Sequence, residues 1–296
     1  MVDLSQSTTA RLSRAFGGRW AAAAGGAVPF TGSHPALVLP LLRLGLPASA
    51  LVIGSLVPDL PYYLPTPVTA AETHTLAGVF GANVLLGVGA FLVWHLVLVP
   101  PLLWAAPEGL QRRIPNNLRP GIARRLDTAG DLARVCLALV IGALTHVVWD
   151  AFTHAGMWGP RGVPWLTATV SGFTLFRWLH LASSLAGLAC LAWFGVRWWR
   201  GTPAIWDCAP ISPTLRWSLV AGLLGWSTWA ATRAGVEMFQ LAGPVNVAYL
   251  PVEILTRFLS TAVLGLVGFA VAWHVAQALR TERDPARPGT MPPRRS

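Results

Sequence analysis

Two histidines and an aspartate recur at four-residue intervals inside a strongly apolar part of the sequence. His146, Asp150 and His154 lie in the run that begins at Thr145, and most of the residues between them are apolar. An ionisable side chain in the middle of a membrane helix costs about 2.5 to 3.5 kcal/mol on insertion scales, so such groups usually have a partner, an ion or a function. We expect a metal ion here.

The spacing of these residues limits how they can share an ion. Residues four apart in a helix lie on one face, so His146, Asp150 and His154 should form a stripe. His146 and His154 would be about 12 Å apart along the axis, whereas metal bonds are about 2.0 to 2.2 Å long. One ion should therefore bind only a neighbouring pair, and the other ligands must come from elsewhere in the chain.

The other candidate ligands are His34, Asp59 and His74, which lie in a proline-rich segment that could fold back on itself. The predicted metal ligands are thus His34, Asp59, His74, His146 and Asp150. Imidazoles and carboxylates without a thiolate suit a divalent metal, zinc before manganese or iron, and a catalytic site leaves a position open for water. An unligated carboxylate such as Asp150, or else His154, would serve as the general base.

Structural roles are the alternative for each of these residues. Asp150 could accept a hydrogen bond from His146 or Arg177 and pin two helices together. The segments around His34 and His74 could be helix caps, made by Ser33 or Thr31 and by Thr73, and Asp59 could be a turn residue. His180 is expected in interface packing before a site role, and His95 and His274 as hydrogen-bonded core residues.

The elements that would hold such a site are membrane helices. Hydrophobic residues make up 54% of the chain and charged residues 11%, which disfavours a soluble fold. A transmembrane helix needs about 20 apolar residues. Five stretches qualify, of which the fourth is the shortest: Leu76 to Trp104, Leu132 to His154, Phe173 to Trp199, Leu215 to Ala231 and Ile254 to Ala278.

A sixth stretch, Pro35 to Val57, is apolar but interrupted by Pro40, Gly45 and Pro47. It either crosses the membrane or re-enters it. The expected fold is therefore an all-α, polytopic bundle of five or six spans with a re-entrant or broken N-terminal segment. Residues 29–280 would form this domain, after a disordered leader or mis-assigned start at residues 1–28 and before a disordered cytoplasmic tail at residues 281–296.

Arginines predict the orientation, because positive residues in short loops stay in the cytoplasm. They gather between the predicted first and second spans, after the third, and from Arg280 onward, which places the C-terminus in the cytoplasm of a plasma-membrane protein. The formal charge of +10 then points to membrane lipid as the partner. Neither nucleic acid nor a protein partner is predicted. Cys136, Cys190 and Cys208 have no CxxC spacing and predict no thiolate site.

From Val28 the chain resembles a family of bacterial integral membrane proteins, domain of unknown function 4184. The resemblance covers roughly residues 28–200 and rests on four segments: Pro29 to Ala36, Ala50 to Asp59, Thr73 to Gly78 and Gly142 to His154. It implies a membrane architecture but no activity, because none is established for the family.

A looser similarity, to membrane-bound metal-dependent hydrolases, lies in the segments around Asp59, His74 and His146. That group usually has a second Asp and a further His where this chain has Pro61 and Thr69, which puts a two-metal centre in doubt. The similarity implies metal-dependent hydrolysis of a lipid-like ester or phosphodiester at the outer membrane face. The alternative is a non-catalytic membrane protein with a buried His/Asp network or a structural metal.

Overall fold

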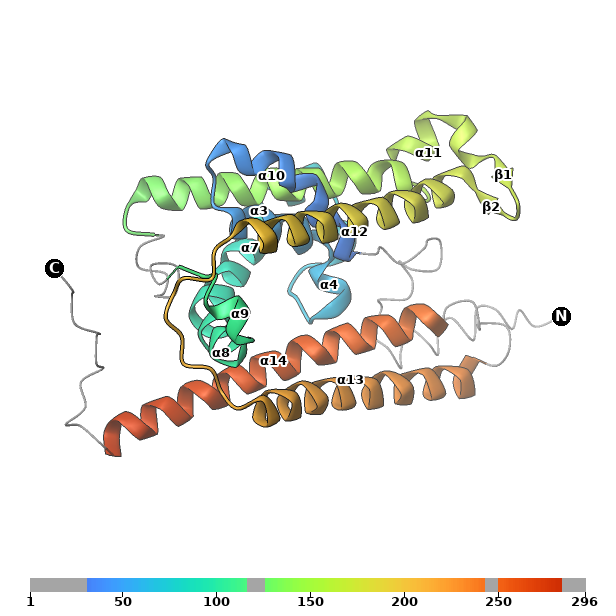
Figure 1. Ribbon diagram of the computed structural model, residues 1–296. Helices are drawn as coiled ribbons and strands as arrows, with labels where there is room; N and C mark the ends of the chain where they lie inside the picture. Colours follow the sequence, from blue (N-terminus) through green and yellow to red (C-terminus); the bar gives the residue numbers. More distant parts are fainter. Residues whose placement is uncertain (1–30, 116–125, 243–249, 284–296) are drawn as a thin grey trace.

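Helices make up nearly all regular structure in the described residues of the computed structural model, which are 31–115, 126–242 and 250–283 (Figure 1). Two short strands, β1 (Thr169–Val170) and β2 (Phe173–Thr174), pair antiparallel just before α12. The predicted leader, and residues 284–296 of the predicted tail, lie outside the described part of the chain. The predicted all-α helical bundle is confirmed.

Four helices in the described ranges are long and apolar enough to cross a membrane, so this is a membrane protein. They are residues Ala82–Ala105, α10 (Ala129–Thr153), α12 (Leu175–Gly201) and Glu253–Arg280 of α14 (Leu250–Arg283). The first is continuous through α7 (Ala82–Leu92), the π-helical turn η3 (Val93–Leu98) and α8 (Val99–Ala105).

The described ranges thus hold four candidate spans, where the sequence predicted five or six. The predicted span Leu215 to Ala231 falls in α13 (Pro213–Ala242), which is 30 residues long and packs along α14 (Figure 1). It is long enough to cross a membrane. Because its sequence mixes aliphatic residues with Trp, Ser, Thr and Gly, it is not among the four apolar helices.

The segment from Pro35 to Val57 is a helical hairpin. Its first arm is the 3₁₀ helix η1 (Thr31–Leu44), which contains Pro35 and Pro40, and its second arm is α3 (Ala48–Leu56). Gly45 has a φ of +66° at the turn, a left-handed conformation that glycine adopts without strain. Because η1 and α3 pack together, the segment doubles back instead of crossing. The prediction of a broken segment is confirmed.

Glycines bring the backbones of α3 and α10 into direct contact. A Cβ atom on Gly142 would lie 2.3 Å from the carbonyl oxygen of Leu51, and one on Gly54 would lie 2.4 Å from that of Leu139. Small residues permit this close approach between helices in lipid. The contact seals a core of buried residues, among them Val38 and Phe91, and it sets the end of α3 beside the middle of α10.

Two histidines outside the predicted site hold the membrane helices together. Pro101 has no N–H for the carbonyl of Val97, and His274 of α14 donates its Nε2 proton to that oxygen over 3.0 Å. His95 is buried and hydrogen-bonds Ser49 over 2.9 Å. Both are hydrogen-bonded, as the sequence predicted, although His274 is only half-buried.

The remaining described elements are short. They are η2 (Val57–Asp59), α4 (Leu60–Tyr63), α5 (Ala70–Thr73), α6 (Leu76–Phe80), α9 (Glu108–Gln111), α11 (Trp158–Gly162) and η6 (Pro164–Thr167). The first four follow the hairpin: η2 and α6 pack against both α10 and α7, α5 packs against α7, and α4 packs against α14.

Candidate metal centre

Side chains from three separate segments converge where the hairpin ends. Asp59 closes η2, His74 follows the last residue of α5, and His146 and Asp150 lie one turn apart on α10. One ligand atom from each of the four lies within 4.8 Å of the others. Asp59, His146 and Asp150 are fully or almost fully buried.

Five of the six distances between these ligand atoms match the edges of a regular tetrahedron, and the sixth, between the oxygens of Asp59 and Asp150, is within 4.8 Å. The Nε2 atoms of His74 and His146 are 3.3 Å apart. Nε2 of His74 is 3.3 Å from both Asp59 Oδ1 and Asp150 Oδ2, and Nε2 of His146 is 3.4 Å and 3.3 Å from the same two oxygens. A tetrahedron with such edges has its centre about 2.0 Å from each corner, which is the usual length of a zinc bond to nitrogen or oxygen.

Backbone carbonyls fix both imidazoles in the form that a metal requires. Nδ1 of His146 lies 2.8 Å from the carbonyl oxygen of Ser55, and Nδ1 of His74 lies 2.8 Å from that of Ala70. A carbonyl can only accept, so each Nδ1 carries the proton and each Nε2 can present a lone pair to the cluster. This is the usual outer-shell arrangement of metal-binding histidines.

One carboxylate oxygen of Asp59 accepts a hydrogen bond and the other does not. Thr31 donates its hydroxyl proton to Oδ2 over 2.5 Å, whereas Oδ1 is buried and makes no hydrogen bond. Burial raises the pKa of Asp59, but the nearby imidazoles of His146 and His74 outweigh it and hold that pKa below its usual range. The orphaned Oδ1 is an anionic ligand aimed at the centre of the cluster.

The pKa of His74 shows that the cluster favours positive charge. Burial lowers the pKa of His74, but hydrogen bonds to Asp150 and Asp59 outweigh it and raise the pKa to about 9. Protons on both Nε2 atoms would face each other across 3.3 Å, so two imidazolium ions fit the cluster poorly. A single divalent cation meets the same demand without that repulsion.

The second oxygen of Asp150 faces two further histidines. Its Oδ1 lies 3.0 Å from Nε2 of His34 and 3.3 Å from Nδ1 of His154. The ring of His34 stacks on that of His146 with centroids 3.9 Å apart. His34, predicted as a ligand, thus lies beside the four-atom set, and its ligand role stays a prediction. His146 and His154 lie on opposite oxygens of Asp150, consistent with the expectation that they do not share an ion.

The alternative capping roles are met by other residues. Thr69 and Thr75, not Thr73, cap α5 and α6, and Thr73 donates to the carbonyl of Pro58 instead. Asp59 makes no side-chain capping bond to α4. Arg177 lies over the ring of Phe173, and no ion pair between it and Asp150 occurs among the described residues.

Pro61 and Thr69, the two residues that differ from the hydrolase pattern, have local structural roles here. Pro61 is buried in the first turn of α4, where a proline is tolerated. Thr69 forms a capping box with Glu72, which positions the short helix that ends at His74. Neither position adds a ligand to the cluster.

Sequence reasoning missed the residues that support the ligands. Thr31 was considered only as a cap, yet its hydroxyl joins Asp59 to the phenol of Tyr63, 2.8 Å away. Burial and the charge of Asp59 raise the pKa of Tyr63 to about 12, so its phenol stays neutral. His180 is buried with its ring edge-on to His154, the centroids 4.9 Å apart. The sequence signal for the supporting role of Thr31 was its position three residues before His34.

Comparison with known proteins gives a family and no activity. No curated protein and no solved structure matches the chain. A family model matches residues 28–279, well beyond the stretch on which the sequence resemblance rested. By this match the chain belongs to the family described as Domain of unknown function (DUF4184).

Proposed function

We propose that this protein is a metal-dependent hydrolase that binds one zinc ion through Asp59, His74, His146 and Asp150. Its substrate would be an ester or phosphodiester of a lipid-like molecule. The tetrahedral spacing of the four ligand atoms carries the metal assignment. The neutral imidazoles and buried carboxylates suit zinc better than calcium or magnesium, which prefer six or more oxygen ligands or retain water.

The hydrolytic part of the proposal rests on histidines that ligation does not use. His154 lies against Asp150, and its buried Nε2 has no hydrogen-bond partner. A zinc ion at the four ligands would lower the pKa of a water molecule to about 7. His154 is placed to accept a proton, and Asp150 Oδ1 beside its Nδ1 would stabilise the imidazolium that results. His34 would hold Asp150 in position through its Nε2.

The depth of the cluster suits a substrate that lies in the membrane surface. Asp150 is three residues and His146 seven residues before Thr153, where α10 ends. At 1.5 Å per residue, the ligands lie about 5 to 10 Å from that end. A lipid headgroup, whose ester and phosphate groups occupy the same depth, could approach them from the predicted outward side.

A structural metal site is the second candidate, and one observation favours it. Four protein ligands, all shielded from solvent, complete a tetrahedron, and closed four-ligand sites are typical of structural zinc. A catalytic site would need one of the carboxylates to leave a position open. The two candidates agree on the metal and differ only in turnover.

Metal analysis combined with a hydrolysis assay tests the proposal. Purified protein should contain about one zinc per chain, and His74→Gln and His146→Gln should lose it, whereas His274→Gln, outside the cluster, should retain it. Lipid-like esters and phosphodiesters should be cleaved by the zinc-loaded protein. His154→Gln should keep its metal and lose about 10²- to 10⁴-fold in rate, as expected for a missing general base.

The outcomes separate the candidates. Full zinc content without any hydrolysis across the substrate panel would support a structural zinc site and rule out the hydrolase. Metal content that is negligible in the wild type, or unchanged in both ligand variants, would refute metal binding and with it the hydrolase.

A further inference from the structure

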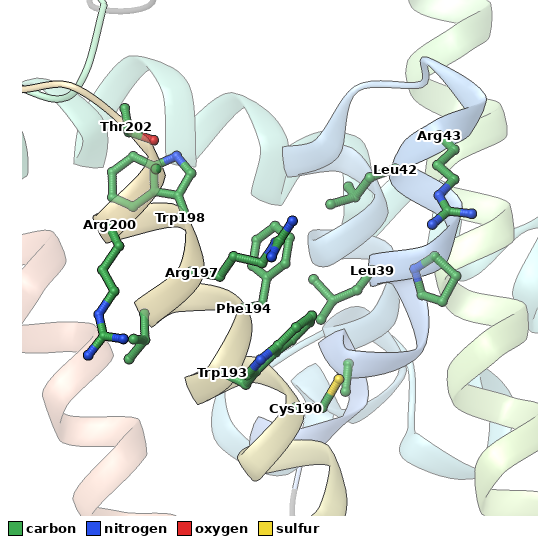
Figure 2. Close-up of a pocket in the computed structure, with 14 residues that line it drawn as sticks. Leu39, Leu42, Arg43, Cys190, Trp193, Phe194, Arg197, Trp198, Arg200 and Thr202 are labelled. Atoms are coloured by element: carbon green, nitrogen blue, oxygen red, sulfur yellow. The ribbon is translucent and has the colours of Figure 1, made fainter.

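A groove of about 1150 Å³ runs between η1 and the C-terminal half of α12, away from the metal cluster (Figure 2). It begins at Ala36 of η1 and Cys190 of α12 and ends at Thr202. Gly187, less than one turn before Cys190, packs on Ser33, which places the start of the groove next to the hairpin arm that carries His34.

The walls of the groove are apolar and face the membrane. Leu39 and Leu42 line it from η1, and Trp193 and Phe194 line it from α12. Trp193 is 62% exposed, although it lies in a helix that crosses the membrane. Such a side chain is covered by lipid in the native membrane, and its concave setting fits hydrocarbon chains.

Three arginines line the same groove. Arg43 projects from η1, and Arg197 and Arg200 project from the last turns of α12 (Figure 2). The guanidinium of Arg197 lies 5.8 Å from the centre of the Trp193 ring. In the described part of the chain no carboxylate pairs with any of the three.

Charge and depth together identify the occupant. Three unpaired positive groups beside an apolar groove complement a ligand with an anionic head and hydrocarbon tails. Arg197 and Arg200 lie at the end of a membrane-crossing helix, with Trp198 beside them, where headgroups and aromatic side chains meet. Basic pockets between membrane helices bind anionic headgroups in this way.

We propose that this groove binds one anionic phospholipid. Its phosphate contacts Arg197 and at least one of Arg43 and Arg200, and its acyl chains lie along Leu39, Leu42 and Trp193. The site is separate from the metal cluster and does not depend on the hydrolase proposal. The bound lipid would fill the gap between η1 and α12 and so brace the hairpin arm that begins at the cluster.

Native mass spectrometry of the delipidated full-length protein tests this site. Phosphatidylglycerol should bind as a single retained molecule, and phosphatidylcholine should bind more weakly. The double variant Arg197→Gln/Arg200→Gln should lose about 25-fold in affinity for phosphatidylglycerol, about fivefold for each arginine. The matched control is Arg161→Gln/Arg177→Gln, which removes two charges near the opposite end of α12 and should bind as the wild type does.

A second variant tests the apolar space of the groove without changing its charge. Leu39→Trp keeps every arginine but fills the space for the acyl chains, and it should also weaken binding of phosphatidylglycerol. Inorganic phosphate should not displace the lipid.

Three results would overturn the proposal: equal losses in the two double variants, equal binding of phosphatidylcholine, or displacement by phosphate alone. Thermal melting of each variant checks that it is folded.

Discussion

Asp150 is the side chain on which the cluster depends most. One of its oxygens faces His74 and His146, and the other faces His34 and His154. It therefore joins the four-ligand set to the two remaining histidines. Losing its charge would leave the imidazoles with one carboxylate, that of Asp59.

Asp150→Asn should therefore bind metal much more weakly than the wild type. An amide is a neutral and poorer ligand for zinc, and its N–H₂ group would point into the cluster or at His34. We expect metal content to fall from about one ion per chain to a small fraction of that, measured by elemental analysis. Asp131→Asn is the matched control on the same helix, because Asp131 lies in the first turn of α10, where an Asn oxygen can still accept from Thr128. Equal metal content in the two variants would contradict a ligand role for Asp150.

The sequence predicted which residue types gather, because ionisable groups are too costly in lipid to be left without a purpose. It could not predict which histidines would face which oxygen of Asp150. Whether His34 faces the same oxygen of Asp150 as His146 depends on the stacking of its ring, and that follows from tertiary packing. The support from Thr31 and the Ser55 carbonyl likewise depends on contacts across long stretches of chain.

At the scale of elements, the contact between α3 and α10 aligns the site. Gly142 lies one turn before His146, and its neighbour across the interface, Ser55, supplies the carbonyl that holds His146. Anything that separates these helices moves the carbonyl away from Nδ1.

Gly142→Ala tests this dependence. The added Cβ would come within 2.3 Å of the Leu51 carbonyl oxygen, which is backbone and cannot give way cheaply. We expect a destabilisation of about 1 to 3 kcal/mol, as for other overpacked positions, together with weaker metal binding. Gly89→Ala, where a Cβ meets no atom within 4 Å, should melt at or slightly above the wild-type temperature. Thermal melting and metal content of the two variants, compared side by side, decide whether close packing positions the site.

Run length and composition predicted the helices that are uniformly apolar. They are less decisive where a helix is long but mixed in composition, as in α13, which is not among the four candidate spans. They also could not decide the path of the segment with Pro40, Gly45 and Pro47. The hairpin is specified by the left-handed turn at Gly45 and by packing of η1 on α3, which no local pattern reveals.

For the molecule as a whole, the cluster joins parts of the chain that are far apart in sequence. A metal ion there would link the hairpin, the short helices after it and α10 in the folded state only. Removal of the metal with a chelator should therefore lower the melting temperature. A ligand present at about 100 times its Kd stabilises by about 2.7 kcal/mol, which corresponds to about 4 °C for a protein of this size.

Added zinc should restore the melting temperature, and His146→Gln should show no response to the chelator. A wild-type protein that melts at the same temperature with and without chelator would argue against a metal link between these segments.

The hairpin also has a consequence for how the protein is made. Asp59 and His34 emerge from the ribosome well before His146 and Asp150, the groups that surround them in the folded chain. Until α10 has been inserted, the nascent hairpin carries a carboxylate and an imidazole without their partners, which lipid disfavours. A chain that stops before α10 cannot bury them, so translation arrest ahead of that helix should yield a product that the span Ala82–Ala105 anchors but whose hairpin is open to proteases.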